Sequence, residues 1–194
     1  MLRGMPVYYS LVPLGAAMAL GLVESKSHGA GRGWGIRAGA RPWVSDHARG
    51  LGMSRSELVD VLRGYRLAVV ATVAADGQPQ AAVVGIAISD GLEIVFDTVV
   101  GSRKAQNLQR DPRVGVVIGW DREVTVQIDG VADMPSGDEL ERIRACYFVA
   151  YPDGRDRLSW PGITHVRVRP LWLRLSDFNS DPPRIVELRV RELE

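Results

Sequence analysis

Cysteine and histidine are scarce in this 194-residue chain, and their scarcity excludes several kinds of site. Cys146 is the single cysteine, so the chain has neither an intrachain disulfide framework nor a cysteine-clustered zinc or iron-sulfur site. Its apolar neighbours on a predicted helix favour a small core residue over a reactive thiol. The three histidines, His28, His47 and His165, are too scattered to support a histidine metal site or a Ser/His/Asp triad. We therefore expect no metal in the site, and the catalytic residues stay unassigned.

An excess of charge of either sign is also missing. The formal net charge is +1, with 46% hydrophobic and 24% charged residues. This balance argues against bulk nucleic-acid binding and suits one globular domain of ordinary composition. We expect a cytoplasmic protein whose folded domain has neither nucleic acid nor membrane as a partner.

Regular patterning is absent from residues 24–52, which are rich in Gly, Ala, Arg and Ser, and it begins near Met53. The sequence therefore predicts a folded domain over 53–194 and a tail over 1–52. The tail is disordered, or is not native if translation starts at Met53. Val7 to Val23 carries no charge and could instead be a targeting segment or a short membrane anchor, although it contains Pro13. A folded extension is the third alternative.

The first part of the domain alternates short apolar runs with turn residues. Ser54 and Glu57 form a capping box that opens an amphipathic helix. Asp76-Gly77 and Ser89-Asp90-Gly91 mark turns between strands. Strands are expected at 67–74, 80–88, 92–98, 114–120 and 124–132, with one helix at 102–110. So many strands with one helix among them indicate an antiparallel barrel rather than a doubly wound sheet.

The second part begins with another predicted helix. Ser136 and Glu139 match a second capping box, and the helix should end near Tyr151. A loop over 153–162 is followed by expected strands at 163–169, 171–178 and 185–190. The sequence thus predicts one mainly β domain, antiparallel, with short flanking helices.

Two adjacent cations stand where the helix at 102–110 should start. Ser102 is a good N-cap, so Arg103 and Lys104 would lie in the first turn, beside the positive end of the helix dipole. A bound phosphate would offset that charge and accept hydrogen bonds from the free backbone amides. The alternative is that both side chains extend into water. The Gly-rich run of a Walker loop is missing before Lys104, which argues against a nucleoside triphosphatase.

Other candidate ligand contacts are weaker. Trp120 and Trp160 could stack on a planar ligand, but a core role is favoured for each because tryptophan is mostly buried. Trp160 is the better candidate, since its neighbours form a polar loop. Thr125 and Gln127 share one face of their strand and could meet a polar ligand edge or face solvent. The acids between Asp129 and Glu139 fit ordinary strand-end and capping positions, and we assign them no catalysis.

The chain from Val70 to about Met134 resembles the pyridoxamine 5'-phosphate oxidase superfamily of FMN-binding split β-barrels. The residues that carry the resemblance are Val70-Ala71-Thr72-Val73, Asp76-Gly77-Gln78-Pro79, Phe96, Thr98, Gly101-Ser102-Arg103-Lys104-Ala105, Asp111-Pro112-Arg113-Val114, Trp120 and Gly130-Val131-Ala132.

The resemblance implies FMN as cofactor and assigns candidate contacts to it. Ser102, Arg103 and Lys104 resemble the family's grip on the FMN phosphate, and Asp97 with Thr98 matches a pair of contacts on the preceding strand. Ala82, Val83 and Val84 fall on the strand beside the isoalloxazine, and Thr125 is nearest to an FMN-contacting glutamine. Members are usually homodimers with flavin at the interface, so Trp160 or Arg157 could come from the second subunit.

The departures from the family pattern bear on the substrate. Ala82 and Ala87 stand where true pyridoxamine phosphate oxidases carry Arg and Lys, and the C-terminal Arg-x-His substrate signature is absent. We therefore predict little or no vitamin B6 oxidase activity, and an FMN-dependent oxidoreductase acting on an unidentified small molecule. Two alternatives stay open. One is a deazaflavin-dependent reductase of the same fold, and the other is a non-catalytic flavin- or heme-related binding protein.

Overall fold

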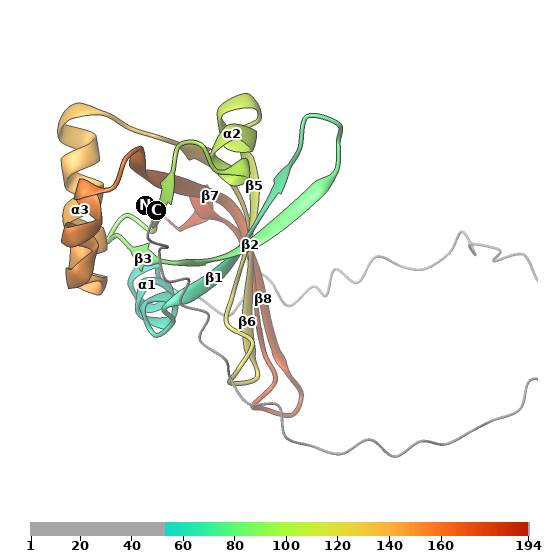
Figure 1. The fold of residues 1–194 in the computed structure, drawn as a ribbon. Coiled ribbons are helices and arrows are strands. Elements are labelled where there is room, and N and C mark those ends of the chain that lie inside the picture. The colour runs from blue at the N-terminus through green and yellow to red at the C-terminus, as the bar shows by residue number, and fades with distance from the viewer. Residues whose placement is uncertain (1–52, 194) are drawn as a thin grey trace, which may run out of the picture. The chain divides into compact units, whose positions relative to one another are not determined.

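The structure is a computed structural model that describes residues 53–193, and every structural statement below concerns this part of the chain. The expectations for residues 1–52 lie outside the described residues. Figure 1 shows a strongly bent sheet with helix α3 along one side and helix α2 at its upper end. Among residues 53–193, no helix is both long and apolar enough to span a membrane.

Helix α1 (Arg55–Arg63) opens the described part. The side chain of Ser54 accepts a hydrogen bond from the Glu57 amide at 3.3 Å, and the Glu57 carboxylate accepts one from the Ser54 amide at 2.7 Å. The predicted capping box is therefore present. Leu58, Val59 and Leu62 form the buried face that packs on the sheet.

Eight antiparallel strands form one sheet within the described residues. Seven follow the order β2-β1-β5-β6-β7-β4-β3, and β8 pairs with β7. Their bounds are β1 (Leu67–Val73), β2 (Pro79–Gly85), β3 (Ala87–Ile88), β4 (Ile94–Val99), β5 (Arg113–Ile118), β6 (Val124–Asp133), β7 (Ile163–Asp177) and β8 (Arg184–Arg189). Helix α2 (Arg103–Arg110) connects β4 to β5. The mainly β, antiparallel prediction is confirmed.

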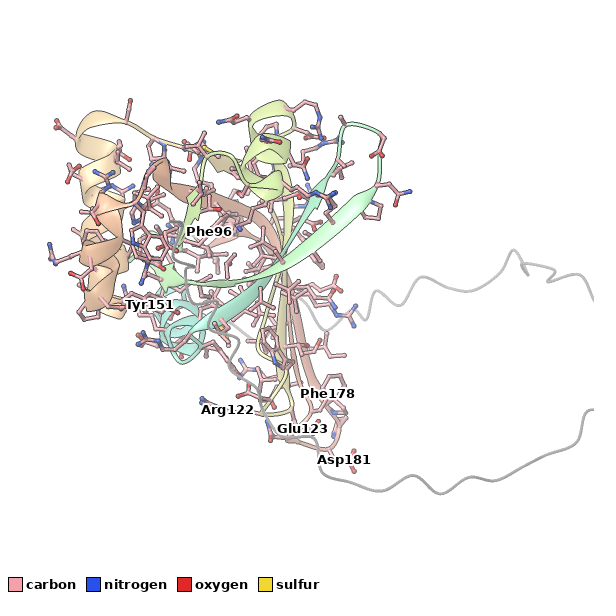
Figure 2. All side chains as sticks on the ribbon, in the orientation of Figure 1. Phe96, Arg122, Glu123, Tyr151, Phe178 and Asp181 are labelled. Carbon is pink, nitrogen blue, oxygen red and sulfur yellow. The ribbon has the colours of Figure 1, made fainter. Side chains whose placement is uncertain are left out.

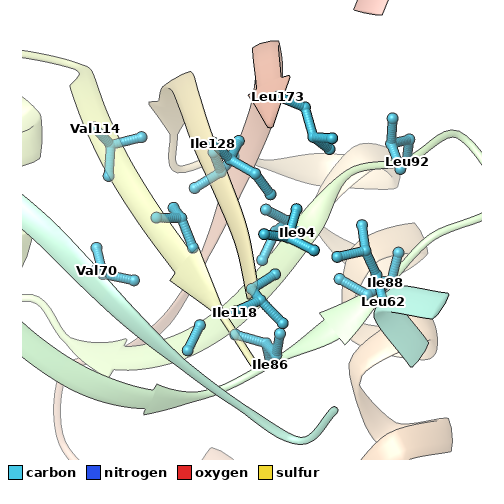
Figure 3. Packing of buried hydrophobic residues seen from close by; sticks show 14 of the residues in the cluster. Leu62, Val70, Ile86, Ile88, Leu92, Ile94, Val114, Ile118, Ile128 and Leu173 are labelled. Atoms are coloured by element: carbon cyan, nitrogen blue, oxygen red, sulfur yellow. The ribbon is translucent and has the colours of Figure 1, made fainter. Parts of the chain in front are cut away.

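The inner face of the bent sheet encloses the main hydrophobic core (Figure 3). Alternate residues of the strands point inward, as Val114, Val116 and Ile118 do on β5. Leu62 and Ile94 are fully buried in the same cluster. The intervening residues of each strand point to the outer face of the sheet.

Helix α3 (Gly137–Ala150) covers β3 and β4 through a second apolar cluster, in which Tyr147, Phe148 and Ile143 pack on Val95 and Ala87. Cys146 is partly buried against this cluster, as its apolar neighbours predicted. The expected cap at Ser136 was wrong, because the Ser136 side chain makes no capping hydrogen bond.

Two further differences from the predicted elements lie after α3. Residues 153–162 are not all loop, since Pro152–Ser159 forms the 3-10 helix η2. The strands expected on either side of Pro170 are one strand, β7. Pro170 fits there because its partner Gly130 lies at a register shift of β6, where the hydrogen-bond ladder is already interrupted. A last 3-10 helix, η3 (Val190–Glu192), follows β8.

The long strands end in two adjoining turns. The Phe178 amide donates to the Glu123 carbonyl at 2.8 Å, which joins the β7–β8 turn to the β5–β6 turn. Figure 2 shows both residues at this tip, far from α2 and α3.

Candidate functional site

Helix α2 begins directly beyond the end of β4, and hydroxyl groups fix its start. The Ser102 side chain accepts a hydrogen bond from the Ala105 amide at 3.3 Å and lies 3.0 Å from the Thr98 hydroxyl. Thr98 is buried, so this contact ties the helix start to the strand. On the other side, Asn107 donates at 3.0 Å to Thr72 of β1 and at 3.0 Å to Gln80 of β2. Hydrogen bonds therefore hold the first two turns of α2 to three strands.

The first turn of α2 presents positive charge without a counter-charge. It contains Arg103 and Lys104 and no acidic residue. Within residues 53–193, neither side chain has a hydrogen-bond or ion-pair partner, and their backbone amides have no acceptor. Two free amides, two cations and the Ser102 hydroxyl thus meet at the positive end of a helix dipole. This arrangement suits the terminal phosphate of a cofactor.

Trp160 lies close to this helix start. The Val100 amide donates to the Gly162 carbonyl at 2.8 Å, and Val99 pairs with Ile163. The turn after η2 therefore runs beside the loop that leads into α2. Trp160 is 55% exposed and Trp120 50% exposed, so the favoured core role is wrong for both. An exposed indole beside the phosphate cradle can cover a planar ring.

Strand β2 brings Ala82, Val83 and Val84 to the same side of the molecule, because β2 contacts β4 and is tied to α2 through Gln80. Val83 points outward and is 61% exposed, whereas Val84 points into the core. Val84 can therefore meet a ligand only through backbone groups, whereas the half-buried Ala82 and the exposed Val83 can also offer small apolar side chains.

Asp97 is on β4 with Thr98, but the alternation of the strand turns the two side chains to opposite faces. Its carboxylate accepts hydrogen bonds from Arg157 of η2 at 2.7 Å and from the Tyr147 hydroxyl at 3.0 Å. Arg157 also pairs with Asp153 at 2.8 Å. Asp97 and Arg157, both candidate site residues, thus form an ion pair within one chain. Arg157 was expected as a contact from the second subunit.

Sequence reasoning did not find Tyr147 or His165 in this cluster. Burial, together with the Asp97 carboxylate, raises the pKa of the Tyr147 hydroxyl, which therefore stays protonated as a hydrogen-bond donor. His165 faces Asp97 across the β4–β7 pair and packs edge-on against Tyr147, with 5.2 Å between ring centroids. Helical spacing identified Tyr147 only as a core residue, and nothing in the pattern linked it to an acid on a distant strand.

Thr125 and Gln127 lie elsewhere, on the outer face of β6. Gln127 is exposed and aligns with Val117 of β5, which aligns in turn with Val69 of β1 and Val83 of β2. Three strand spacings separate Gln127 from Val83, which amounts to about 14 Å. The candidates therefore form two separate groups, one around the α2 start and one on β6, joined by an exposed apolar strip.

The sheet order and the cationic helix start after β4 define a class of protein, the split β-barrel. The sequence profile of the family described as pyridoxamine 5'-phosphate oxidase matches residues 54–170, more than half of the chain. This chain belongs to that family, as the resemblance indicated.

Named relatives agree with this assignment. A pyridoxine/pyridoxamine 5'-phosphate oxidase from Bordetella avium is 36% identical over 92 residues, which cover 47% of this chain and 42% of the relative. The chain thus spans less than half of that relative's length. Among solved structures, a heme binding protein from Mycobacterium smegmatis has a TM-score of 0.62 at 21% identity, covering 74% of this chain and 61% of the other. A pyridoxamine 5'-phosphate oxidase-related, FMN binding protein from Nostoc punctiforme has a TM-score of 0.53 at 14% identity, covering 70% and 86%. At such identities these two structures support the fold.

Proposed function

We propose that this chain binds FMN, with the cofactor phosphate at the start of α2, and works as an oxidoreductase on a small molecule. The observation that carries the proposal is the first turn of α2, where Arg103, Lys104 and their amides have no counter-charge within the described residues. The family assignment and the FMN binding protein of the same fold support this choice of ligand.

The proposed site is completed by a second copy of the chain. Val83 and Gln127 are too far apart on one sheet to contact one ring system, because about 14 Å separates them. A homodimer that pairs the exposed apolar strips would bring the β6 residues of one copy to the α2 start of the other. Trp160 would then cover the ring system and exclude water.

Bound flavin would supply the electron-transfer chemistry, and the protein would supply position and electrostatics. Arg103 and Lys104 would neutralise the phosphate, and the backbone of Ala82 to Val84 would fix the ring edge. Asp97, Tyr147 and Arg157 would support β4 from the opposite face.

We further propose that pyridoxamine 5'-phosphate is not the substrate. Ala82 and Ala87 lack the charged groups expected there for a substrate phosphate, and Ala87 is 4% exposed inside the second apolar cluster. Each missing charged hydrogen bond would remove about 1.5 to 3 kcal/mol of binding free energy. Conversion of pyridoxamine 5'-phosphate at a rate typical of true oxidases would contradict this proposal.

Two alternatives use the same fold. A deazaflavin cofactor could place its phosphate on the same helix start, and the likeness to a heme binding protein raises a non-catalytic binding role. Visible absorption of the purified full chain, with mass identification of the ligand released on denaturation, separates the three. FMN at about one per subunit supports the first proposal, whereas deazaflavin or heme would replace it.

The phosphate cradle is tested by Arg103→Ala with Lys104→Ala. Loss of two charged hydrogen bonds, at about 1.5 kcal/mol or more each, should weaken FMN binding at least about a hundredfold. The matched control is Arg184→Ala, which removes an exposed cation from β8. Fluorescence titration of the apoprotein measures the affinity. Equal affinities of the double variant and the control would remove the basis of the proposal.

A further inference from the structure

A large groove lies apart from every candidate flavin residue. Its volume is about 1550 Å³, and its walls come from α1, the β2–β3–β4 segment, α3, β7 and the β8–η3 end. Figure 1 shows α1, β3 and the lower end of α3 side by side, and α1 and α3 both contact β3. A drug-sized ligand needs about 300 to 1,000 Å³, so the groove can hold a longer molecule.

Arginines outnumber acids along the groove, although acids outside it balance some of them, as Asp133 does for Arg169 at 3.1 Å. Seven arginines and two acids, Asp90 and Glu93, are among its described lining residues. Both acids are already paired, Asp90 with Arg63 at 2.6 Å and Glu93 with Arg142 at 2.7 Å. Burial alone would raise the pKa of Glu93, but hydrogen bonds from Arg142 and Ser89 lower it, so the carboxylate stays ionised within its pairs.

Several of these arginines keep their charge uncompensated by any acid of the described chain. Arg55 and Arg191 have no hydrogen-bond or ion-pair partner within residues 53–193. Arg66 has only neutral partners, since it donates to the Ala150 carbonyl and its guanidinium lies 4.3 Å from the centre of the Tyr151 ring. Figure 2 shows Tyr151 at the lower end of α3. Cations from three separate segments therefore border one concavity.

Aliphatic side chains also line the groove. Val149 and Leu171 are 85% and 58% exposed, whereas Ile86 and Ile88 lie beneath the surface at 2% and 4% exposed. Tyr65 is the one aromatic residue among the described lining residues, and Arg122 already lies 5.3 Å from its ring centre. A planar ring system would find no free pair of aromatic faces, whereas an alkyl chain would find exposed aliphatic side chains.

We infer that this groove binds a long-chain carboxylate, with its alkyl chain against Val149 and Leu171 and its carboxylate at Arg55 and Arg191, the two arginines without a partner among the described residues. Arginine matches a carboxylate through paired N–H donors, and the aliphatic contact supplies the rest of the affinity. The chain's own residues 1–52 are a poor electrostatic match, because they contain six Lys or Arg and two Asp or Glu. The described lining includes Ala87 but none of the candidate cofactor contacts named above.

Cys146 provides a direct readout, since it lines the groove and is the only thiol of the full chain. Burial raises the pKa of this thiol, so its reaction with a thiol reagent is followed at mildly alkaline pH. Oleate, used below its aggregation concentration with the full-length protein, should slow the reaction at least about fivefold. In the urea-unfolded protein oleate should have no effect. Oleyl alcohol supplies the alkyl chain without the negative charge, and inorganic phosphate supplies a negative charge without the alkyl chain. Each should give little protection.

Variants locate the site. Arg55→Gln with Arg191→Gln should weaken oleate binding about tenfold, and Val149→Asp should abolish it, while Arg184→Gln serves as the matched exposed control. None of these changes should alter flavin content. Absence of protection by oleate, equal protection by oleyl alcohol, or protection by hemin alone would each overturn the inference.

Discussion

The Asp97–Arg157 pair is the ion pair most closely associated with the candidate site. The side chains are 18% and 20% exposed, and the Tyr147 hydroxyl is the other partner of Asp97. Arg157→Gln should lower the free energy of unfolding by about 2 to 3 kcal/mol, because it leaves a half-satisfied carboxylate in a mostly buried place. Urea denaturation measures the change. Adding Asp97→Asn should restore at least half of the lost free energy of unfolding. If the losses of the two single variants simply add in the double variant, the two residues do not interact.

His165 should make stability depend on pH. It is 1% exposed, and neither ring nitrogen has a partner within the described residues. Burial lowers its pKa, and Arg144 of α3 and Arg157 of η2 lower it further, against Asp97 of β4 and Glu141 of α3. The unfolded chain thus binds the proton more readily than the folded one. Above the unfolded pKa of about 6.5 both states are neutral and His165 costs no stability. As pH falls below that value, the unfolded state gains protons first and the free energy of unfolding decreases.

The measurement is the free energy of unfolding between pH 7.5 and 5. The wild-type protein should lose stability over this range with a slope of at most about 1.4 kcal/mol per pH unit from this group. His165→Leu places a non-titrating side chain of similar size there, and its free energy of unfolding should depend less on pH over the same range. Parallel curves for the two proteins would rule out His165 as the cause.

Single residues also show where sequence reasoning stopped. Ser102, Arg103 and Lys104 were found because capping and helix-dipole rules act within a few residues. The Asp97–Tyr147 contact joins residues on β4 and α3, so only the folded chain reveals it. The exposure of Trp160 likewise depends on how the η2 turn meets the β4–α2 loop.

The two Ser-x-x-Glu motifs allow a matched test among the helices. Ser54→Ala should cost about 1 kcal/mol of stability, because Ser54 caps α1 in a complete capping box. Ser136→Ala should cost almost nothing, since its side chain makes no capping hydrogen bond. Chemical denaturation of both variants under the same conditions measures the difference. Equal losses would mean that Ser136 also caps α3 in solution.

The two motifs look alike in the sequence because only local spacing is visible there. In the fold, Glu139 accepts hydrogen bonds from Arg142 at 2.9 Å and from Arg167 of β7 at 2.5 Å, which draws it away from Ser136. The strands were better predicted, because alternation of apolar residues is a property of each strand alone. The continuity of β7 through Pro170 was missed, since it depends on the register shift in β6.

The whole molecule exposes an apolar strip on the outer face of the sheet. Val83 is 61% exposed and Val117 is 37% exposed, and both align with Val69 across β1. In the proposed dimer this strip, rimmed by Gln127 and Arg174, would lie in the interface. The local pattern predicted which residues face outward, but whether a second copy covers them is a property of two chains.

Val83→Lys should separate the proposed dimer into monomers, because a lysine would place an unpaired charge within a desolvated interface. Its fold should persist, since the side chain lies outside the core. Light scattering during size-exclusion chromatography gives the mass, and the same fractions give the flavin content. Val149→Lys, on the exposed side of α3, is the control and should stay dimeric with its flavin. If Val83→Lys is monomeric yet binds FMN as tightly as the wild type, the flavin site is complete within one chain and Gln127 of a second copy has no part in it.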